Sequence, residues 1–161
     1  MEMNIKIGFG FDVHPLQAGK DLWLGGVKIP HTKGCVGHSD ADVLIHAICD
    51  ALLGAAGLRD IGNQFPNTDD RFKDIDSKVL LKQTMALLWK KNYKVGNVDC
   101  TLCLEQPKIN PYVGAMQKAL APILQIAEED ISIKATTNEK LGYVGSENGA
   151  NAYAVVLIYK E

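Results

Sequence analysis

The sequence lacks long apolar runs, clusters of basic residues and a strong excess of charge of either sign. Its longest apolar candidate, around residues 43–48, is interrupted by His46, so no segment approaches the roughly 20 residues of a transmembrane helix. Lysine and arginine form no run longer than the pair Lys90-Lys91, and the net charge is −2, which argues against a basic nucleic-acid-binding face. The N-terminus has no charged segment followed by an apolar one, so it does not resemble a signal peptide. We therefore expect a cytoplasmic protein with neither membrane nor nucleic-acid partners.

Repeats, linkers and low-complexity segments are also missing, and 161 residues is the length of one domain, which we place over residues 1–161. A chain of this length buries roughly 70% of its unfolded surface, which is enough for a core without disulfides. The four cysteines lie in apolar contexts: Cys35, Cys49, Cys100 and Cys103. The last two are three apart in a strand-like segment, where they face opposite sides. We predict four buried, reduced thiols rather than a redox or zinc pair.

The pattern of apolar and polar residues predicts strands and helices in the order β–α–α–β–α–β–β. The predicted strands span residues 5–13, 98–104, 131–135 and 152–159, and the predicted helices span residues 40–56, 77–92 and 110–126. We also predict a short hairpin within residues 22–29, an N-cap at Ser39 for the first helix, and a long functional or mobile loop over residues 57–70. This order predicts an α/β (α+β) sandwich in which helices cover one face of a mixed sheet. In the first strand the odd-numbered residues from Ile5 to Val13 are all apolar, which predicts that their face is buried.

The first predicted helix carries a row of ionisable residues where burial is expected. The helix is apolar nearly all round, yet Asp42, His46 and Asp50 fall at i, i+4 and i+8 and so lie along one line. Three such groups on a buried helix cost free energy unless they are paired, bound to a metal or open to a cleft. The row therefore indicates a site.

The first strand supplies partners for that row. Asp12 and His14 project from one face near the predicted end of the strand, where ligands of open α/β sheets gather. With His46 they form a set of two histidines and one carboxylate, the donor set of catalytic zinc sites that keep a fourth position open. Each residue also fits a purely structural role, as a strand end or a hydrogen-bonded core histidine. Spacing alone leaves both interpretations equally open.

Two further segments, residues 8–10 and 136–140, partly match known ligand-binding motifs. Gly8-Phe9-Gly10 lacks the third glycine of a dinucleotide fingerprint, so we reject that interpretation. The segment Thr136-Thr137-Asn138-Glu139-Lys140 offers hydroxyls, an amide and a carboxylate that suit phosphate oxygens and Mg²⁺. An ordinary solvated turn explains the same segment equally well.

Several segments together carry a resemblance that covers essentially the whole chain. They are Gly8–His14, His38–Val43 with His46, Asp60–Gly62, Phe65–Asp69, Gly96–Asp99, Pro107-Lys108 and Lys134–Gly142. This combination resembles the cyclodiphosphate synthases of the non-mevalonate isoprenoid pathway. The resemblance implies a homotrimer with active sites between subunits, each formed by a zinc site of one chain and a nucleotide pocket of the next. It also implies the substrate 4-diphosphocytidyl-2-C-methyl-D-erythritol 2-phosphate, whose 2-phosphate attacks the β-phosphorus to close a cyclic diphosphate and expel CMP.

The resemblance also assigns residues by position. Zn²⁺ would be held by Asp12, His14 and His46, and Mg²⁺ or Mn²⁺ by Glu139; of these, Asp12, His14 and Glu139 would also contact the substrate. His38 and Thr137 would stabilise the transition state and contact the substrate, and Ser39 would contact phosphate. The erythritol phosphate pocket would be lined by Asp60, Ile61, Gly62, Phe65, Pro66, Asn67, Thr68 and Asp69. The cytosine would be enclosed by Leu104, Glu105, Gln106, Pro107, Lys108, Ile109, Asn110 and Thr136, with Val13, Asn138 and Tyr143 elsewhere in the substrate site. We interpret Asp42, one turn before His46, as a residue that shapes the site.

Two departures from the family pattern stand out. Asn67 replaces the aspartate that commonly follows Phe-Pro, and Ser146 and Asn148 replace an arginine and a glutamate. The latter pair is associated with capture of an isoprenoid diphosphate along the trimer axis, and this chain lacks its cation. Two rival functions are a non-catalytic trimeric module that binds a metal or an isoprenoid diphosphate, and a zinc-dependent phosphohydrolase. The retained His38 and Glu139 argue against the module, whereas the sequence alone leaves the hydrolase open.

Overall fold

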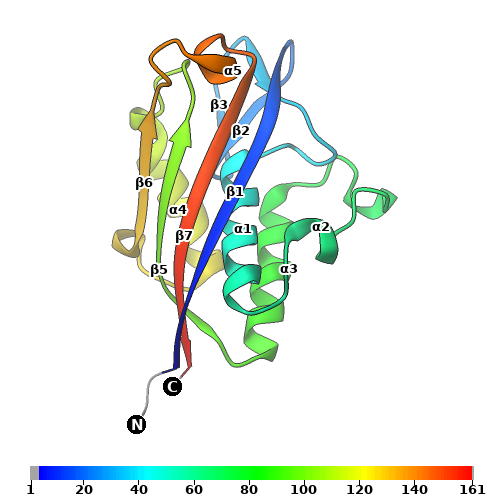
Figure 1. Ribbon diagram of the computed structural model, residues 1–161, viewed down its shortest axis with the longest axis vertical. Helices are drawn as coiled ribbons and strands as arrows, with labels where there is room; N and C mark the ends of the chain where they lie inside the picture. The colour runs from blue at the N-terminus through cyan, green and yellow to red at the C-terminus, as the bar shows by residue number, and fades with distance from the viewer. Residues whose placement is uncertain (1–3, 161) are drawn as a thin grey trace.

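The computed structural model describes residues 4–160, which form a mixed five-stranded sheet with helices on one of its faces (Figure 1). The strands are β1 (Asn4–Ala18), β2 (Leu22–Leu24), β3 (Val27–Ile29), β4 (Lys33–Cys35), β5 (Lys94–Cys103), β6 (Ile131–Thr136) and β7 (Gly149–Lys160). The helices are α1 (Val43–Ala55), α2 (Ile61–Gln64), α3 (Ser77–Lys90), α4 (Val113–Leu124) and α5 (Gly142–Gly145), with 3₁₀ turns at Asp70–Phe72, Asn110–Tyr112 and Glu128–Asp130. Among the described residues no helix is long and apolar enough to cross a membrane.

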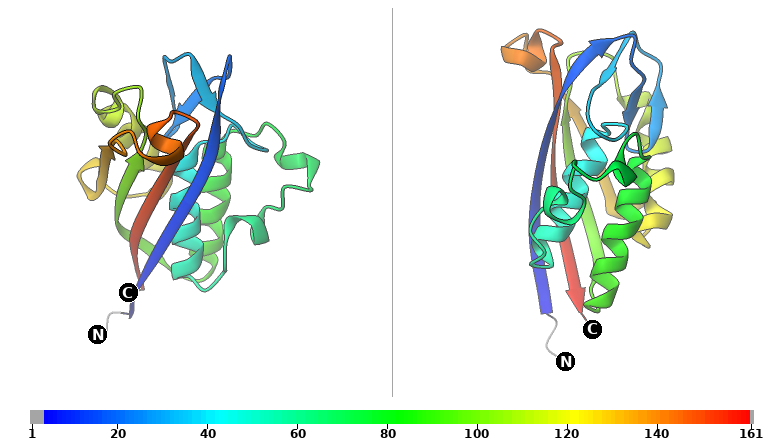
Figure 2. Two further views of the ribbon diagram at one scale, coloured as in Figure 1. Left: turned by 45° about the horizontal axis from the view of Figure 1, so that its top comes forward. Right: turned by 90° about the vertical axis from the view of Figure 1, so that its right-hand side faces the viewer.

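The main sheet has the strand order β4-β1-β7-β5-β6, and β2 and β3 form a separate hairpin. Strands β5 and β6 run parallel, whereas the other neighbours in the main sheet are antiparallel. Helices α1, α3 and α4 lie on the same side of the sheet (Figure 2). The predicted mixed sheet with helices on one face is therefore confirmed. The predicted hairpin is also confirmed, and it turns at Gly25 and Gly26, which both have positive φ.

Strand β1 turns its glycines toward the helices, not its apolar residues. A Cβ atom at Gly8 would lie 1.8 Å from the Ala51 carbonyl oxygen, and one at Gly10 would lie 1.9 Å from that of Ala47, so α1 crosses β1 where only glycine fits. Because side chains alternate along a strand, the odd-numbered apolar residues face the other way. The prediction that they form the buried face is wrong for the isolated chain.

The uncovered side of the sheet carries a continuous apolar surface. Seven side chains that are each more than a third exposed form what we call the open face: Ile5, Ile7, Phe9, Phe11, Val13, Tyr153 and Val155. The rings of Phe11 and Tyr153 lie 5.1 Å apart across the β1–β7 pair. An apolar surface on this scale is typical of an interaction site.

The core lies between the helices and the inner face of the sheet. Helix α1 is buried nearly all round, as predicted, with Leu44, Ile48 and Leu52 fully inaccessible. Small residues of β7, such as Ala152 and Ala154, are buried in the same core. The four cysteines are buried and free, which confirms the predicted reduced thiols.

Three element boundaries differ from the sequence-based prediction. Helix α1 begins at Val43, and its N-cap is Asp42 rather than Ser39, because the Asp42 carboxylate accepts a hydrogen bond from the Ile45 N–H at 3.0 Å. Strand β1 continues to Ala18 through pairing with β4, so Asp12 and His14 lie inside the strand rather than at its end. The predicted helix from residue 110 begins as a 3₁₀ turn without a side-chain cap, and α4 itself starts at Val113.

Candidate metal centre and substrate pocket

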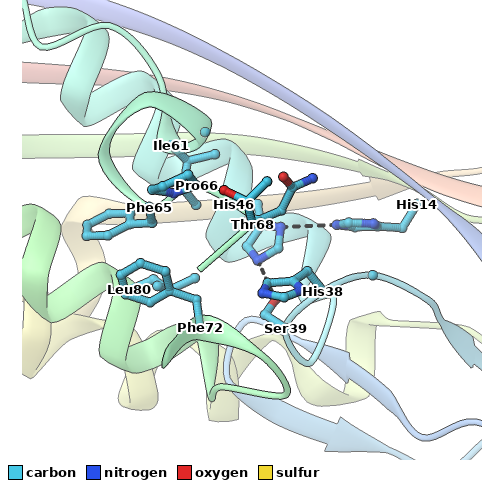
Figure 3. A pocket seen from close by; sticks show the side chains of 13 residues that line it. His14, His38, Ser39, His46, Ile61, Phe65, Pro66, Thr68, Phe72 and Leu80 are labelled. Carbon is cyan, nitrogen blue, oxygen red and sulfur yellow. Dashed lines mark hydrogen bonds between the residues drawn. The ribbon is translucent and has the colours of Figure 1, made fainter. Parts of the chain in front are cut away.

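Three predicted ligands converge between β1 and α1. The His14 Nε2 atom lies 2.9 Å from Asp12 Oδ2 and 3.0 Å from His46 Nδ1, and His46 Nδ1 lies 3.1 Å from Asp12 Oδ2. These atoms form a nearly equilateral triangle, and the two imidazoles point toward one another (Figure 3). Tetrahedral bonds of about 2.0–2.1 Å to Zn²⁺ separate neighbouring donor atoms by about 3.3 Å. We call Asp12, His14 and His46 the trio. Their three donor atoms need to move apart by only a few tenths of an ångström, so they fit such an ion.

The electrostatics of the trio favour positive charge at its centre. Burial raises the pKa of Asp12, but hydrogen bonds to His14 and His46 outweigh it and bring the pKa down to about 2. Burial lowers the pKa of His46, but the hydrogen bond and the charge of Asp12 outweigh it, and the net pKa is raised. A carboxylate that stabilises protons on its neighbours also suits a cation in their place.

Hydrogen bonds on the outer side orient both imidazoles. The Nδ1 atom of His14 donates to the Val36 carbonyl oxygen at 3.1 Å, so in the neutral imidazole the Nε2 atom, which faces Asp12 and His46, carries the lone pair. The Nε2 atom of His46 lies 3.0 Å from the hydroxyl oxygens of both Ser39 and Ser77. Such outer partners are typical of metal-binding histidines.

The three ionisable residues Asp42, His46 and Asp50, which lie along one line of α1 and its N-cap, make three different contacts. His46 faces the trio, whereas the fully buried Asp42 accepts hydrogen bonds from the backbone N–H groups of Gly25, Gly26 and Ile45 at 2.7–3.0 Å. Burial raises the pKa of Asp42 despite these bonds. Asp50 accepts from the Ile61 N–H at 2.7 Å and so attaches α2 to α1. Asp42 therefore anchors the β2–β3 turn to the start of α1 without joining the trio by a hydrogen bond.

A cavity of about 470 Å³ opens beside the trio (Figure 3). It is lined by His14, Gly37, His38, Ser39, His46, Ile61, Gly62, Phe65, Pro66, Asn67, Thr68, Phe72 and Leu80. Most residues predicted for the erythritol phosphate pocket are in this set. Asp60 instead caps α2 at the Asn63 N–H, and the Asp69 side chain pairs with Arg71 while its carbonyl oxygen accepts from His38 Nε2 at 3.2 Å.

Sequence reasoning missed two apolar walls of this cavity. Phe72 packs its ring edge-on against Phe65 at 5.5 Å, and Leu80 belongs to the buried stripe of α3. The sequence predicts the helix over residues 77–92 that carries Leu80, but it does not indicate that Leu80 borders a pocket.

A second hollow, of about 130 Å³, lies at the ends of β5 and β6. It is lined by Leu104, Glu105, Pro107, Lys108, Ile109, Asn110, Ala135, Thr136 and Thr137, most of which are the residues predicted around cytosine. Glu105 is buried and accepts a hydrogen bond from the Asn138 N–H at 3.2 Å. The exposed Tyr143 accepts one from Asn151 at 2.6 Å, and Gln106, Asn138, Glu139 and Tyr143 do not line the hollow.

The two hollows are separated across the width of the sheet: the larger one lies beside β1 and the smaller one at the ends of β5 and β6. The register aligns Val13 of β1 with Asn151 of β7, Cys103 of β5 and Thr136 of β6 in one row. Three strand spacings separate the ends of this row, which is roughly 14 Å. One chain therefore does not bring the segment after Thr136, with Thr137 and Glu139, to the ligand trio.

Comparisons with known proteins agree along the whole chain. The YgbB family pattern matches residues 5–159. The 2-C-methyl-D-erythritol 2,4-cyclodiphosphate synthase of Cytophaga hutchinsonii is 62% identical over 158 residues, which cover 98% of this chain and 99% of that protein. The solved structure of IspF from Plasmodium falciparum in complex with CDP is similar with a TM-score of 0.86 at 37% identity, covering 98% and 97% of the two chains. The bifunctional IspDF from Campylobacter jejuni is similar with a TM-score of 0.95 at 40% identity, and this chain matches 43% of its length. The chain belongs to the YgbB family.

Proposed function

We propose that this chain converts 4-diphosphocytidyl-2-C-methyl-D-erythritol 2-phosphate to 2-C-methyl-D-erythritol 2,4-cyclodiphosphate and releases CMP, as a phosphorus–oxygen lyase of isoprenoid precursor biosynthesis. The observation that carries the proposal is the convergence of Asp12, His14 and His46 beside the 470 Å³ cavity, whose wall includes both histidines. The name of the 62% identical relative and the CDP complex of a structural neighbour support it. We further propose that the enzyme is a single cytoplasmic domain.

The cations would supply charge neutralisation. Zn²⁺ at the trio and Mg²⁺ or Mn²⁺ at Glu139 would polarise phosphoryl oxygens and offset the charge of the diphosphate when bound. The protein itself contributes position. His38 and Ser39 border the cavity, where the Ser39 hydroxyl is placed to donate a hydrogen bond to a phosphate oxygen. His38 already donates from Nε2 to the Asp69 carbonyl oxygen, which holds its ring at the cavity wall. The apolar side chains of Ile61, Phe65 and Leu80 exclude water from the opposite wall. The displacement is intramolecular because the 2-phosphate and the β-phosphorus belong to one substrate, and holding both ends of that substrate would align them, which supplies much of the rate.

A homotrimer would complete the site. Within one chain, β7 lies between β1, which carries two residues of the trio, and the β5–β6 pair that borders the smaller hollow. Packing of a second copy against the open face would cover residues such as Ile7 and Phe9, which are 70% and 64% exposed. The same packing would bring Thr137 and Glu139 of one subunit toward the trio of another. We therefore propose that the cytidine part of the substrate binds one subunit and the erythritol phosphate part the next.

Phosphorus NMR tests the reaction directly. The protein is incubated with the cytidyl diphosphate substrate, Zn²⁺ and Mg²⁺, and the expected products are CMP and a cyclic diphosphate. A linear product beside CMP would indicate a phosphohydrolase, and no turnover would indicate a non-catalytic binding module. His46→Gln is expected to abolish turnover. His31→Gln is the matched control, because His31 is the one histidine that lines neither hollow.

A further inference from the structure

A buried serine and an aspartate form a chain of contacts behind His46. Ser77, the first residue of α3, is fully inaccessible, and its hydroxyl oxygen lies 3.0 Å from His46 Nε2. The Ser77 hydroxyl donates to Asp40 Oδ1, and the Ser77 N–H donates to Asp40 Oδ2 at 3.0 Å. Asp40 also accepts from the Asp42 N–H at 3.2 Å. Both oxygens of Asp40 are thereby held in place.

Counting hydrogens fixes the direction of the bonds that link His46, Ser77 and Asp40. A serine hydroxyl carries one hydrogen, and an ionised carboxylate can only accept. Because the Ser77 hydrogen goes to Asp40, the Ser77 oxygen must accept from His46 Nε2. In a neutral imidazole only one nitrogen carries a hydrogen, so Nδ1 then has the lone pair. That is the atom of His46 that faces Asp12 and His14. In the metal-free protein the Ser77 oxygen and the Asp12 carboxylate therefore compete for the one imidazole hydrogen, whereas a metal ion bound at Nδ1 would leave that hydrogen to Ser77.

We propose that Asp40 and Ser77 are positioning residues that set the tautomer of His46 for metal binding. The inference rests on the metal site of the proposed function and adds to it two residues that touch neither the trio's centre nor the large cavity. His14 obtains the same result by a direct bond to the Val36 carbonyl oxygen, so its tautomer does not depend on Ser77. The two histidines are therefore oriented by separate means.

The same count leaves Ser39 with a hydrogen to give. Its hydroxyl oxygen lies 3.0 Å from His46 Nε2 and 3.5 Å from the Ser77 hydroxyl oxygen, and it accepts from the Ala41 N–H at 3.2 Å. With the imidazole N–H as a donor on that side, His46 does not need the Ser39 hydrogen, and the contact with Ser77 is long. Ser39 borders the large cavity, where this hydrogen is available to a phosphate oxygen. Asp40 and Ser77 thus orient a ligand and a substrate donor together.

Two readouts test the inference. Long-range proton–nitrogen NMR of the histidine rings reports the tautomer, in the metal-free protein at alkaline pH and in the zinc-loaded protein. Zn²⁺ affinity is measured separately by competition with a chelator. Wild-type His46 is expected to carry its hydrogen on Nε2. Ser77→Ala is expected to mix the tautomers of His46 but not of His14 and to weaken Zn²⁺ binding about 10- to 100-fold. Ser77→Thr retains the hydroxyl and is expected to stay within about 3-fold of wild type.

Asp40→Ala and Asp76→Ala separate orientation from helix stability. Asp40→Ala removes the acceptor that takes the Ser77 hydrogen, so we expect a loss of Zn²⁺ affinity at least as large as for Ser77→Ala. Asp76 caps the same helix start through the Lys78 N–H at 2.8 Å, and Asp76→Ala removes this cap but should leave Zn²⁺ affinity unchanged. A hydrogen on Nδ1 of wild-type His46 would overturn the inference, and so would an equal loss in Asp76→Ala. A wild-type protein that binds no Zn²⁺ would refute the metal site, while the tautomer measurement on the metal-free protein would still decide the role of Ser77.

Discussion

Gly10→Ala is expected to weaken the fold and the metal centre together. The added Cβ would lie 1.9 Å from the Ala47 carbonyl oxygen, whereas Cβ contacts below 3.0 Å essentially never occur. Relieving the clash requires β1 and α1 to separate by about 1.1 Å, since backbone atoms meet it on the helix side. His46 precedes Ala47 on α1, and the other two ligands lie on β1. The same movement would therefore lengthen the edges of the trio that end at His46 from 3.0 and 3.1 Å to about 4 Å.

The magnitude follows from this geometry. Overpacking a core costs about 1–3 kcal/mol, and a clash with backbone belongs at the upper end. For a chain of this size that loss lowers the melting temperature by about 6–12 °C. Zn²⁺ affinity is expected to fall at least about 10-fold, because the donor atoms no longer match a single ion.

Urea unfolding of the chelator-treated protein measures the first effect, and chelator competition measures the second, both at matched protein concentration. Gly54→Ala is the control on the same helix, because its Cβ would meet nothing within 4 Å. Alanine favours helix over glycine, so this variant is expected to be as stable as wild type or more stable, by up to about 1 kcal/mol. The reasoning is refuted if Gly10→Ala unfolds within about 0.5 kcal/mol of wild type and keeps its Zn²⁺ affinity.

Three further predictions concern the thiols, the open face and the pH dependence. Burial raises the pKa of Cys35, Cys49 and Cys100 to about 12, so at pH 8 only about one thiol in ten thousand is ionised. Ellman's reagent should react with these thiols only after urea is added, and rapid reaction of the native protein would contradict the described burial. Phe9→Asp should convert the proposed trimer to a monomer in size-exclusion chromatography with light scattering, whereas Val79→Asp, on the outer surface of α3, should not. The folded-state pKa of His46 is raised above its ordinary value of 6.5, so its stabilisation is complete below pH 6.5 and is lost as the pH rises through the folded pKa. The unfolding free energy of the metal-free protein should fall over that range, and His46→Gln should flatten the curve; a rise with pH would count against the assignment.

Much of the fold and the ligand trio could be predicted because both follow from short-range periodicity. Residues two apart in a strand share a face, so the sequence alone predicts that Asp12 and His14 lie on the same side of β1. Periodicity shows which residues share a face but not which face is covered. For β1 that choice depends on Gly8 and Gly10, whose size admits α1, and their significance appears only when the helix is in place.

Contacts between residues far apart in the chain could not be predicted from the sequence. Ser77 meets His46 across 31 positions, and Asp40 meets Ser77 across 37, with no local pattern that connects them. The start of α1 was misplaced for a different reason. Ser39 and Asp42 are both good N-caps, and tertiary contacts decide between them, because the Asp42 carboxylate also binds the glycine turn of the hairpin.

The double use of β1 has a consequence for how this chain can vary. From Gly8 to His14 every side chain either packs against α1 and the trio or belongs to the open face. Inserting or deleting one residue there would exchange the two sides, driving Phe9 and Phe11 into the helix and turning both ligands outward. Length changes among relatives should therefore accumulate in surface loops and be absent from this strand, whose register places both the metal-ligand candidates and the open face.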